Sequence, residues 1–412
     1  MTGETGMSGG RRQPRVLIYS HDSFGLGHLR RCRALAHAIC EDIDDLSVLI
    51  LSGSPIIGSF DFRSRVDFVR VPGVIKLRNG EYTPLTLPMA IEDAIGMRAS
   101  IIRHTAEVFD PDIMIVDKEP LGLRGELADT LEVMKERGVH IVLGLRDVLD
   151  DPDLLLPEWT RKNAVPALQK YYDEIWVYGL PQMCEPLAGL ELPASVTRKM
   201  TYTGYLQRFD DTTSTLELPP ASRDRPFILV TPGGGGDGEE LVDWVLRAYE
   251  RDATLPHPSL IVLGPFMQSE RRTEFIARAD ALRDVEAITF DAHMESLMAR
   301  AVGVVAMGGY NIFCEILSFD KRALIVPRTV PRREQLIRAS RAEELGLVTM
   351  LRGDNERGAD TMATALRHLP QQQRPSASVV PGLLDGLENV NILTRQALER
   401  QPRPVLAARQ RA

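Results

Sequence analysis

Short apolar or alternating runs recur along the chain and are separated by segments in which apolar residues have helical spacing. In the first half these runs are 16–20, 48–51, 66–71, 113–117, 140–145 and 174–178. In the second half they are 227–230, 260–263, 287–290, 304–306 and 323–326, and a terminal helix is expected at about 383–400. Strands that alternate with helices in this way predict two α/β units, each with a largely parallel sheet and helices on both faces.

A polar stretch from about 203 to 226 separates the two series. We therefore expect an N-terminal Rossmann-like domain at 14–205, a linker at 206–226, a second such domain at 227–385, and a terminal helix with a loose tail at 386–412. A chain of 412 residues is long enough for two cores of this size. Two such domains should place a ligand cleft between the carboxyl ends of their sheets.

Composition narrows the classes of function. The net charge of −8 argues against broad nucleic-acid binding, which needs a basic surface. The four cysteines are scattered without a Cys-x-x-Cys pair, which argues against a zinc site or a disulfide framework and favours a reducing compartment. No apolar run approaches the ~18 residues of a membrane span, and the first 14 residues lack the apolar core of a secretory signal. We expect a cytoplasmic protein, and peripheral membrane contact stays open.

A glycine-rich turn in the second half is the strongest candidate for a ligand site. The apolar run 303–306 is followed by Gly308 and Gly309, and Asn311 is a candidate cap for the next helix. Free amides at a helix start, next to glycines, suit a phosphate group. Glu315, one turn into that helix, can accept hydrogen bonds from the two hydroxyls of a ribose. A simple packing turn with a solvated glutamate is the competing interpretation.

The first half opens with a strand, a glycine loop and a helix, and His28 ends the loop after Gly25 and Gly27. An imidazole at that point can take a proton from a hydroxyl or from water near neutral pH. Arg30 and Arg31 can hold an anion or can simply solvate a helix face. The loop lacks the third glycine of the dinucleotide fingerprint, so it is a weak signal by itself.

Other polar stretches also follow predicted strands. The four glycines at 233–236 can approach a phosphate or act as a hinge, and no Walker lysine follows them. Asp117 ends the run 113–117, and Glu119 lies two residues beyond it. The two carboxylates can act as a base or bind a metal, but there is no Asp-x-Asp pair to favour the metal. The segment 72–88 is polar and rich in Gly and Pro and predicts a long exposed loop on the acceptor side.

With these residues in view, the chain resembles the GT-B glycosyltransferases, in particular those with the family 28 C-terminal domain. That family includes the peptidoglycan lipid-intermediate N-acetylglucosaminyltransferase and the galactolipid synthases. The stretch 309–315 is similar to the family's glycine-to-glutamate donor motif, and 334–339 is similar to its glutamine motif. The resemblance implies a GT-B fold, Glu315 on the ribose, the glycine loops on the diphosphate, Gln335 on the donor sugar, and inversion without a metal or cofactor.

The chain also departs from that family. Ile312 stands where the family motif has Thr, and Glu334 replaces the first of two glutamines. The stretch 25–31 lacks the family's doubled glycines and is similar to the Gly-x-Gly-His-x-x-Arg of the nucleotide-sugar hydrolases of nonulosonic-acid synthesis. Those enzymes share the fold and use the histidine to activate water.

We predict a glycosyltransferase that moves a sugar from a nucleotide-diphospho-sugar, UDP-linked by preference, to an acceptor hydroxyl, with His28 as general base. The acceptor, whether saccharide, lipid-linked or small molecule, is not identified by the sequence. The alternatives are a hydrolase in which His28 activates water and a non-catalytic sugar-nucleotide-binding protein; a 2-epimerase ranks lower because its acidic residues are not found. The predicted substrate contacts are Gly25, Gly27, Arg31, Gly233, Gly234, Gly235, His293, Met294, Gly308, Gly309, Tyr310, Asn311, Glu315 and Gln335.

Overall fold

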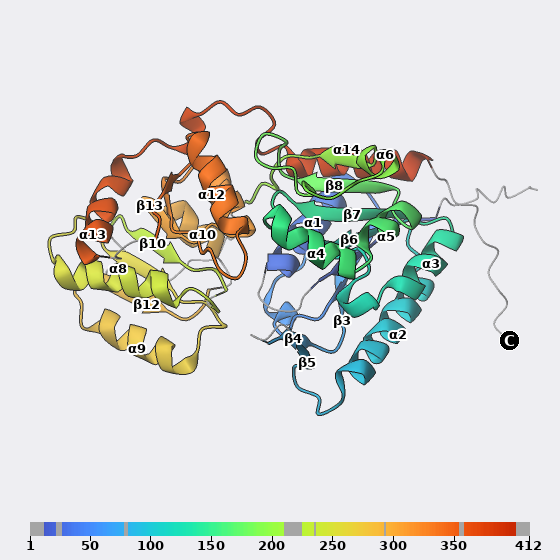
Figure 1. The fold of residues 1–412 in the computed structure, drawn as a ribbon, viewed down its shortest axis with the longest axis horizontal. Helices are drawn as coiled ribbons and strands as arrows, with labels where there is room; N and C mark the ends of the chain where they lie inside the picture. Colours follow the sequence, from blue (N-terminus) through green and yellow to red (C-terminus); the bar gives the residue numbers. More distant parts are fainter. Residues whose placement is uncertain are drawn as a thin grey trace, which may run out of the picture.

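The molecule consists of two α/β lobes that lie side by side (Figure 1). The computed structural model describes residues 12–21, 27–77, 81–209, 225–234, 236–291, 294–353 and 358–400. Each lobe is built on a parallel sheet, of seven strands in the first lobe and six in the second. The predicted α/β class with two parallel sheets is confirmed.

The first sheet runs from residue 15 to residue 202. Its order is β3 (Val66–Arg70), β2 (Ser47–Ser52), β1 (Arg15–Ser20), β6 (Ile113–Asp117), β7 (His140–Arg146), β8 (Glu174–Tyr178) and β9 (Met200–Tyr202). The helices of this part are α1 (Gly27–Asp42), α2 (Ile91–Phe109), α3 (Ala128–Glu136), α4 (Pro152–Arg161), α5 (Ala164–Lys170) and α6 (Ala194–Thr197).

The second sheet has the order β12 (Val285–Ile288), β11 (Ser259–Val262), β10 (Ile228–Thr231), β13 (Gly303–Ala306), β14 (Ala323–Ile325) and β15 (Thr349–Met350). Its helices are α8 (Glu239–Arg251), α9 (Ser269–Asp280), α10 (Met294–Arg300), α11 (Tyr310–Ser318), α12 (Glu334–Glu344) and α13 (Ala359–His368), and the chain then forms α14 (Gly386–Arg400).

Both faces of the central strands are buried, which is why these strands have nearly continuous apolar sequences. On β1, Val16 and Ile18 join a core with α1 and α14, whereas Leu17 and Tyr19 join a second core with α2 and α3. In each sheet the order reverses beside the first strand, between β1 and β6 and between β10 and β13. Parallel sheets bind ligands at such reversal points, at the carboxyl ends of the strands.

Several sequence-based boundaries were wrong. The predicted loop 72–88 contains an antiparallel pair, β4 (Val74–Lys76) and β5 (Tyr82–Pro84). The strand expected at 287–290 begins two residues earlier. The terminal helix begins at Gly386, as in the domain division, and not at about 383 as the apolar pattern predicted. The edge strands β9 and β15, of three and two residues, were missed because they are too short to form an apolar run.

The chain crosses between the lobes at two adjacent points. Leu206 pairs with Asp385 in an isolated β-bridge, and the backbones are so close that a Cβ on Gly386 would lie 2.5 Å from the carbonyl oxygen of Tyr205. Helix α14 then returns to the first lobe, where Arg395 Nε lies 2.8 Å from Asp42 Oδ2. The predicted linker 206–226 is described only at its two ends, and the predicted tail 401–412 lies outside the described residues.

A buried ion pair joins the two lobes. Arg338 on α12 donates from Nε and Nη2 to the two carboxylate oxygens of Asp147, at 2.7 and 2.6 Å, and both side chains are fully buried. The hydroxyl of Tyr205 donates to Asp147 Oδ2 at 2.7 Å, and Arg338 Nη1 donates to the carbonyl of Gly308 at 2.9 Å. The pair therefore has its hydrogen bonds satisfied from both lobes.

None of the helices in the described ranges has the length and hydropathy that a bilayer crossing requires.

We expect Asp147→Asn to destabilise the protein by about 3–5 kcal/mol, because Arg338 would keep a buried charge without a compensating carboxylate. Urea unfolding followed by tryptophan fluorescence measures the loss. The double variant Asp147→Asn/Arg338→Met should lose less than the single variant, since it removes the orphaned charge. As a control, Arg341→Met removes an arginine of the same helix that is 41% exposed, and it should cost less than about 1 kcal/mol. Equal losses for Asp147→Asn and Arg341→Met would contradict the role of the pair.

Candidate functional site

A cavity of about 270 Å³ lies between the lobes, where the two points of strand-order reversal face each other. Its lining from the first lobe is Gly27, His28, Arg30, Arg31, Phe60 and Arg146. From the second lobe it includes Thr231, Gly233, Gly234, Met294, Gly309, Tyr310, Asn311, Arg328, Glu334 and Gln335. The structure thus brings most of the described candidate residues to one place.

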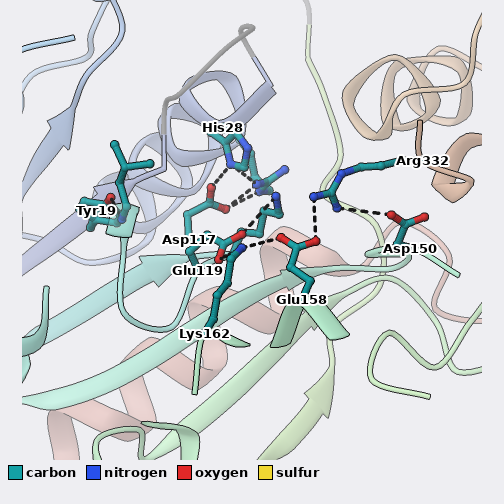
Figure 2. A network of polar contacts seen from close by, with 11 residues as sticks. Tyr19, His28, Asp117, Glu119, Asp150, Glu158, Lys162 and Arg332 are labelled. Carbon is teal, nitrogen blue, oxygen red and sulfur yellow. Dashed lines mark hydrogen bonds and ion pairs between the residues drawn. The ribbon is translucent and has the colours of Figure 1, made fainter. Parts of the chain in front are cut away.

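His28 is held by a carboxylate from the neighbouring strand. Helix α1 places the histidine beside the end of β6, where Nδ1 contacts Oδ2 of the buried Asp117 (Figure 2). Arg31, one turn further along α1, donates to the other oxygen of Asp117 from Nε at 2.8 Å and from Nη2 at 2.5 Å. With Nδ1 engaged by the carboxylate, Nε2 is the nitrogen left to accept a proton.

Burial keeps the imidazole of His28 neutral. Desolvation lowers the pKa of His28 below its usual 6.5, and the negative charge of Asp117 opposes that shift only in part. Asp117 itself is buried, but the adjacent Arg31 and His28 hold the pKa of its carboxyl well below the usual range. A neutral histidine oriented by an ionised aspartate is the arrangement of a general base.

Two glycine turns and a helix start form the opposite wall. Gly233, after β10, has a φ of +84°, and a Cβ on Gly264 would lie 2.6 Å from the backbone of Gly234. Gly308, after β13, has a φ of +81°, and Gly309 caps α11, so the free amides at the start of this helix lie at the cavity. Such an end favours an anionic group.

Arg146 supplies a cation that the sequence analysis did not single out. It ends β7 and lines the cavity, and its Nε has no hydrogen-bond partner among the described residues. Burial lowers the pKa of its guanidinium to about 10, which still leaves it charged at neutral pH. Its position in the sequence could have identified it, because it directly follows the predicted strand 140–145 and therefore lies at the same sheet edge as Asp117.

Glu315 lies beneath the cavity wall and does not line it. Its side chain is fully buried, and its Oε1 lies 2.5 Å from Nη2 of Arg30, which also donates to Oε1 of Glu295 at 2.8 Å. Burial raises the pKa of the Glu315 carboxyl to about 7, the charge of Arg30 opposes this shift, and the charge of Glu295 adds to it. The predicted ribose contact stays a prediction, and it requires Arg30 to release the carboxylate.

The predicted cap at Asn311 was wrong. Helix α11 starts at Tyr310 with Gly309 as its cap, so Asn311 lies inside the first turn and its side chain can turn outward. There Nδ2 donates to the carbonyl of Gly27 at 2.8 Å, and Oδ1 accepts from Arg208 Nη2 at 2.9 Å. Asn311 therefore bridges the two lobes at the rim of the cavity.

The other candidates are placed as follows. Tyr310 is buried, and Arg31 and Arg338 lie over its ring, with guanidinium carbons 5.5 and 5.8 Å from the ring centroid. Gln335 accepts from the backbone amide of Arg328 at 3.1 Å at the cavity edge. Gly25, Gly235 and His293 lie outside the described residues, so their predicted roles stay predictions. No group of three or more His, Cys, Asp and Glu side chains within the described ranges is arranged to hold a metal ion.

Comparison with solved structures decides the fold. LpCGTa in complex with UDP matches with a TM-score of 0.61 and 14% identity over 94% of this chain and 99% of that one. The calicheamicin glycosyltransferase CalG4 matches with a TM-score of 0.57 and 14% identity over 94% and 99%. The fold is GT-B. A putative UDP-N-acetylglucosamine 2-epimerase from Listeria monocytogenes, with a TM-score of 0.61 and 14% identity over 95% and 98%, is equally similar. No family model and no curated protein matches the sequence.

We expect Asp117→Asn to lower the pKa of His28 further, because the aspartate charge stabilises the imidazolium form. An NMR titration of the His28 ring in protein with labelled histidine measures this shift. Asp93→Asn removes an exposed carboxylate on α2 and should leave the His28 titration unchanged. A higher pKa for His28 in Asp117→Asn than in the wild type would contradict the assigned pairing.

Proposed function

We propose that this protein is a glycosyltransferase that uses a nucleotide-diphospho-sugar, UDP-linked by preference, and inverts the anomeric carbon. The observation that carries the proposal is the His28–Asp117 pair, which faces a glycine-lined helix start across an interlobe cavity. Structures of the same fold include LpCGTa in complex with UDP and a Phytolacca americana protein complexed with UDP-2-fluoro-glucose, which supports a uridine sugar nucleotide. The resemblance of 309–315 and 334–339 to the family 28 motifs points the same way.

In the proposed reaction the acceptor hydroxyl gives its proton to Nε2 of His28. The acceptor oxygen forms a bond to the anomeric carbon as the bond from that carbon to the diphosphate oxygen breaks, and the electron pair leaves with the nucleotide diphosphate. Asp117 stabilises the imidazolium that forms, as a carboxylate partner does in hydrolytic triads. The imidazolium later loses its proton to solvent, which completes the cycle.

Stabilisation of the negative charge that develops on the leaving diphosphate is assigned to the second lobe and to Arg146. The free amides at the start of α11 and the glycine turn at Gly233 and Gly234 provide donors without side chains in the way. Arg146 adds a partly desolvated charge from the first lobe, where a low local dielectric strengthens its effect. Gln335 lies at the same wall and is assigned to the donor sugar.

We expect His28→Ala to lower turnover by about 10²–10⁴-fold, the usual contribution of a general base. UDP affinity, measured by calorimetry, should change little because the donor contacts lie mainly on the other lobe. Since the pKa of His28 lies below 6.5, the fall of kcat/KM of the wild type on the acid side should have its midpoint below pH 6.5. Near-normal turnover in His28→Ala would remove this residue from the role.

The same assay distinguishes transfer from hydrolysis. With labelled UDP-sugar and no acceptor, the wild type should release free sugar much more slowly than it glycosylates an acceptor. Fast and stoichiometric release of free sugar would instead establish the hydrolase that the 25–31 motif resembles. Recovery of an epimerised donor would establish the third activity found on this fold.

We expect Glu315→Ala to weaken UDP binding by about 10- to 100-fold, the value of a hydrogen bond to a charged group. The loss should vanish for 2′,3′-dideoxy-UDP, which lacks the ribose hydroxyls. Glu295→Ala is the matched control, because it also removes a carboxylate from Arg30 and leaves the ribose contact in place. If Glu315→Ala binds both nucleotides as the wild type does, the ribose assignment is wrong.

A further inference from the structure

A second cavity, of about 780 Å³, lies within the first lobe. Its lining includes His21, directly after β1, and the segment 119–125, which follows β6. The start of α2 and the junction of α4 with α5 complete it. Tyr82 of β5 also contributes to its lining. Nothing in the donor chemistry described above uses this space.

The second cavity meets the interlobe cavity of about 270 Å³, to which the donor is assigned and which is called the donor cavity below, at a pair of histidines. His21 and His28 stack edge to face with ring centroids 5.6 Å apart, and each lines one of the two cavities. The β6 end has the same division, because Asp117 contacts His28 and Glu119 lines the second cavity. Between them Lys118 has a φ of +68°, in the left-handed region. A molecule in the second cavity can therefore present a group to His28.

The charges around the second cavity balance one another. Its charged lining residues are Glu81, Glu92, Glu119, Arg124, Arg161 and Lys162, three of each sign. Glu119 lies 2.7 Å from Lys162 and 3.4 Å from Lys118, and Lys162 also pairs with Glu158 at 2.5 Å (Figure 2). At the mouth Arg124 lies 3.5 Å from Glu92. The six charges sum to zero, so a charged ligand would lose its hydration here without meeting a net opposite charge, whereas a neutral ligand needs no such charge.

The cavity also offers a polar group that lacks a partner. His21 is only 5% exposed, and its Nδ1 has no hydrogen-bond partner among the described residues. Burial lowers the pKa of His21 well below 6.5, so the ring is neutral. A neutral ring can donate a hydrogen bond to a hydroxyl or accept one from it. Ile91, Leu121 and Leu123 supply apolar surface beside it, which suits the C–H faces of a sugar ring.

We infer that the second cavity binds the acceptor, that the acceptor is a neutral, polyhydroxylated molecule such as a sugar or glycoside, and that His21 holds one of its hydroxyls. This inference rests on the proposed glycosyl transfer, in which another hydroxyl of the same molecule gives its proton to His28. His21 is then a residue that positions the acceptor and selects it by charge.

Binding of sugars to the second cavity can be measured without any nucleotide-sugar donor. Saturation-transfer NMR with methyl β-D-glucopyranoside, D-glucuronate and D-glucosamine should show binding of the neutral glycoside and little of the two charged sugars. His21→Phe keeps an aromatic ring and removes the hydrogen bond, and Ile91→Trp fills the cavity from its partly exposed rim. Both should weaken glycoside binding by about tenfold or more, the value of one or two lost contacts. His140→Phe replaces an equally buried histidine outside both cavities and should bind as the wild type does.

The kinetic measurement then separates the two proposals. In His21→Phe the KM for the neutral acceptor should rise about tenfold, while the KM for the donor stays unchanged. Preferred binding of a charged sugar, no binding of any probe, or normal glycoside binding in His21→Phe would each overturn the inference. Glycoside binding that depends on His21, without transfer from any nucleotide sugar, would instead overturn the proposed transferase and support the ligand class.

Discussion

The ion pair between Asp147 and Arg338 fixes how the two lobes face each other. Removing two charges from water costs several kcal/mol, and the pair offsets this only because its geometry is bidentate and its remaining hydrogen-bonding groups reach Tyr205 and Gly308. One of those contacts is the carbonyl of the glycine turn that precedes α11. The interface therefore positions the start of α11, which lines the interlobe cavity, relative to the first sheet. Apolar packing supports the same register, since the rings of Tyr205 and Phe313 lie 5.1 Å apart.

One strand end serves both structure and chemistry. Asp147 follows β7 and joins the lobes, and Arg146 immediately before it lines the donor cavity. On the adjacent strand, Asp117 orients His28 while Glu119, two residues on, faces the second cavity. Because parallel strands end at the same edge of a sheet, residues a few positions apart can serve different neighbours. The proposed reaction centre is therefore built from a few residues at these strand ends, and the surrounding loops would define the acceptor.

The sequence predicted the sheets because their strands are buried on both faces and have apolar runs that a pattern can detect. It also singled out His28 and the glycine turns, because they lie in the loops that follow such runs, and the structure places His28, Gly233 and Gly309 on one cavity. It could not predict the pairing of Arg338 with Asp147 or of Arg30 with Glu315, since these partners are far apart in the chain and an arginine near a helix start is ordinarily solvated. Arg146 was missed for the same reason: its importance depends on what surrounds it in space, and strand ends commonly carry charge.

The position of Glu315 shows where a motif and its environment can disagree. The residue occupies the place of the ribose ligand in the glycosyltransferase motif that this stretch resembles, but Arg30 of the other lobe holds its carboxylate. Arg30 also lines the donor cavity, so a diphosphate bound there would offer it an anion in exchange for Glu315. Such an exchange would free the carboxylate for the ribose and keep every charge paired. Nucleotide binding and the contact between α1 and α11 are then coupled, because the same guanidinium takes part in both.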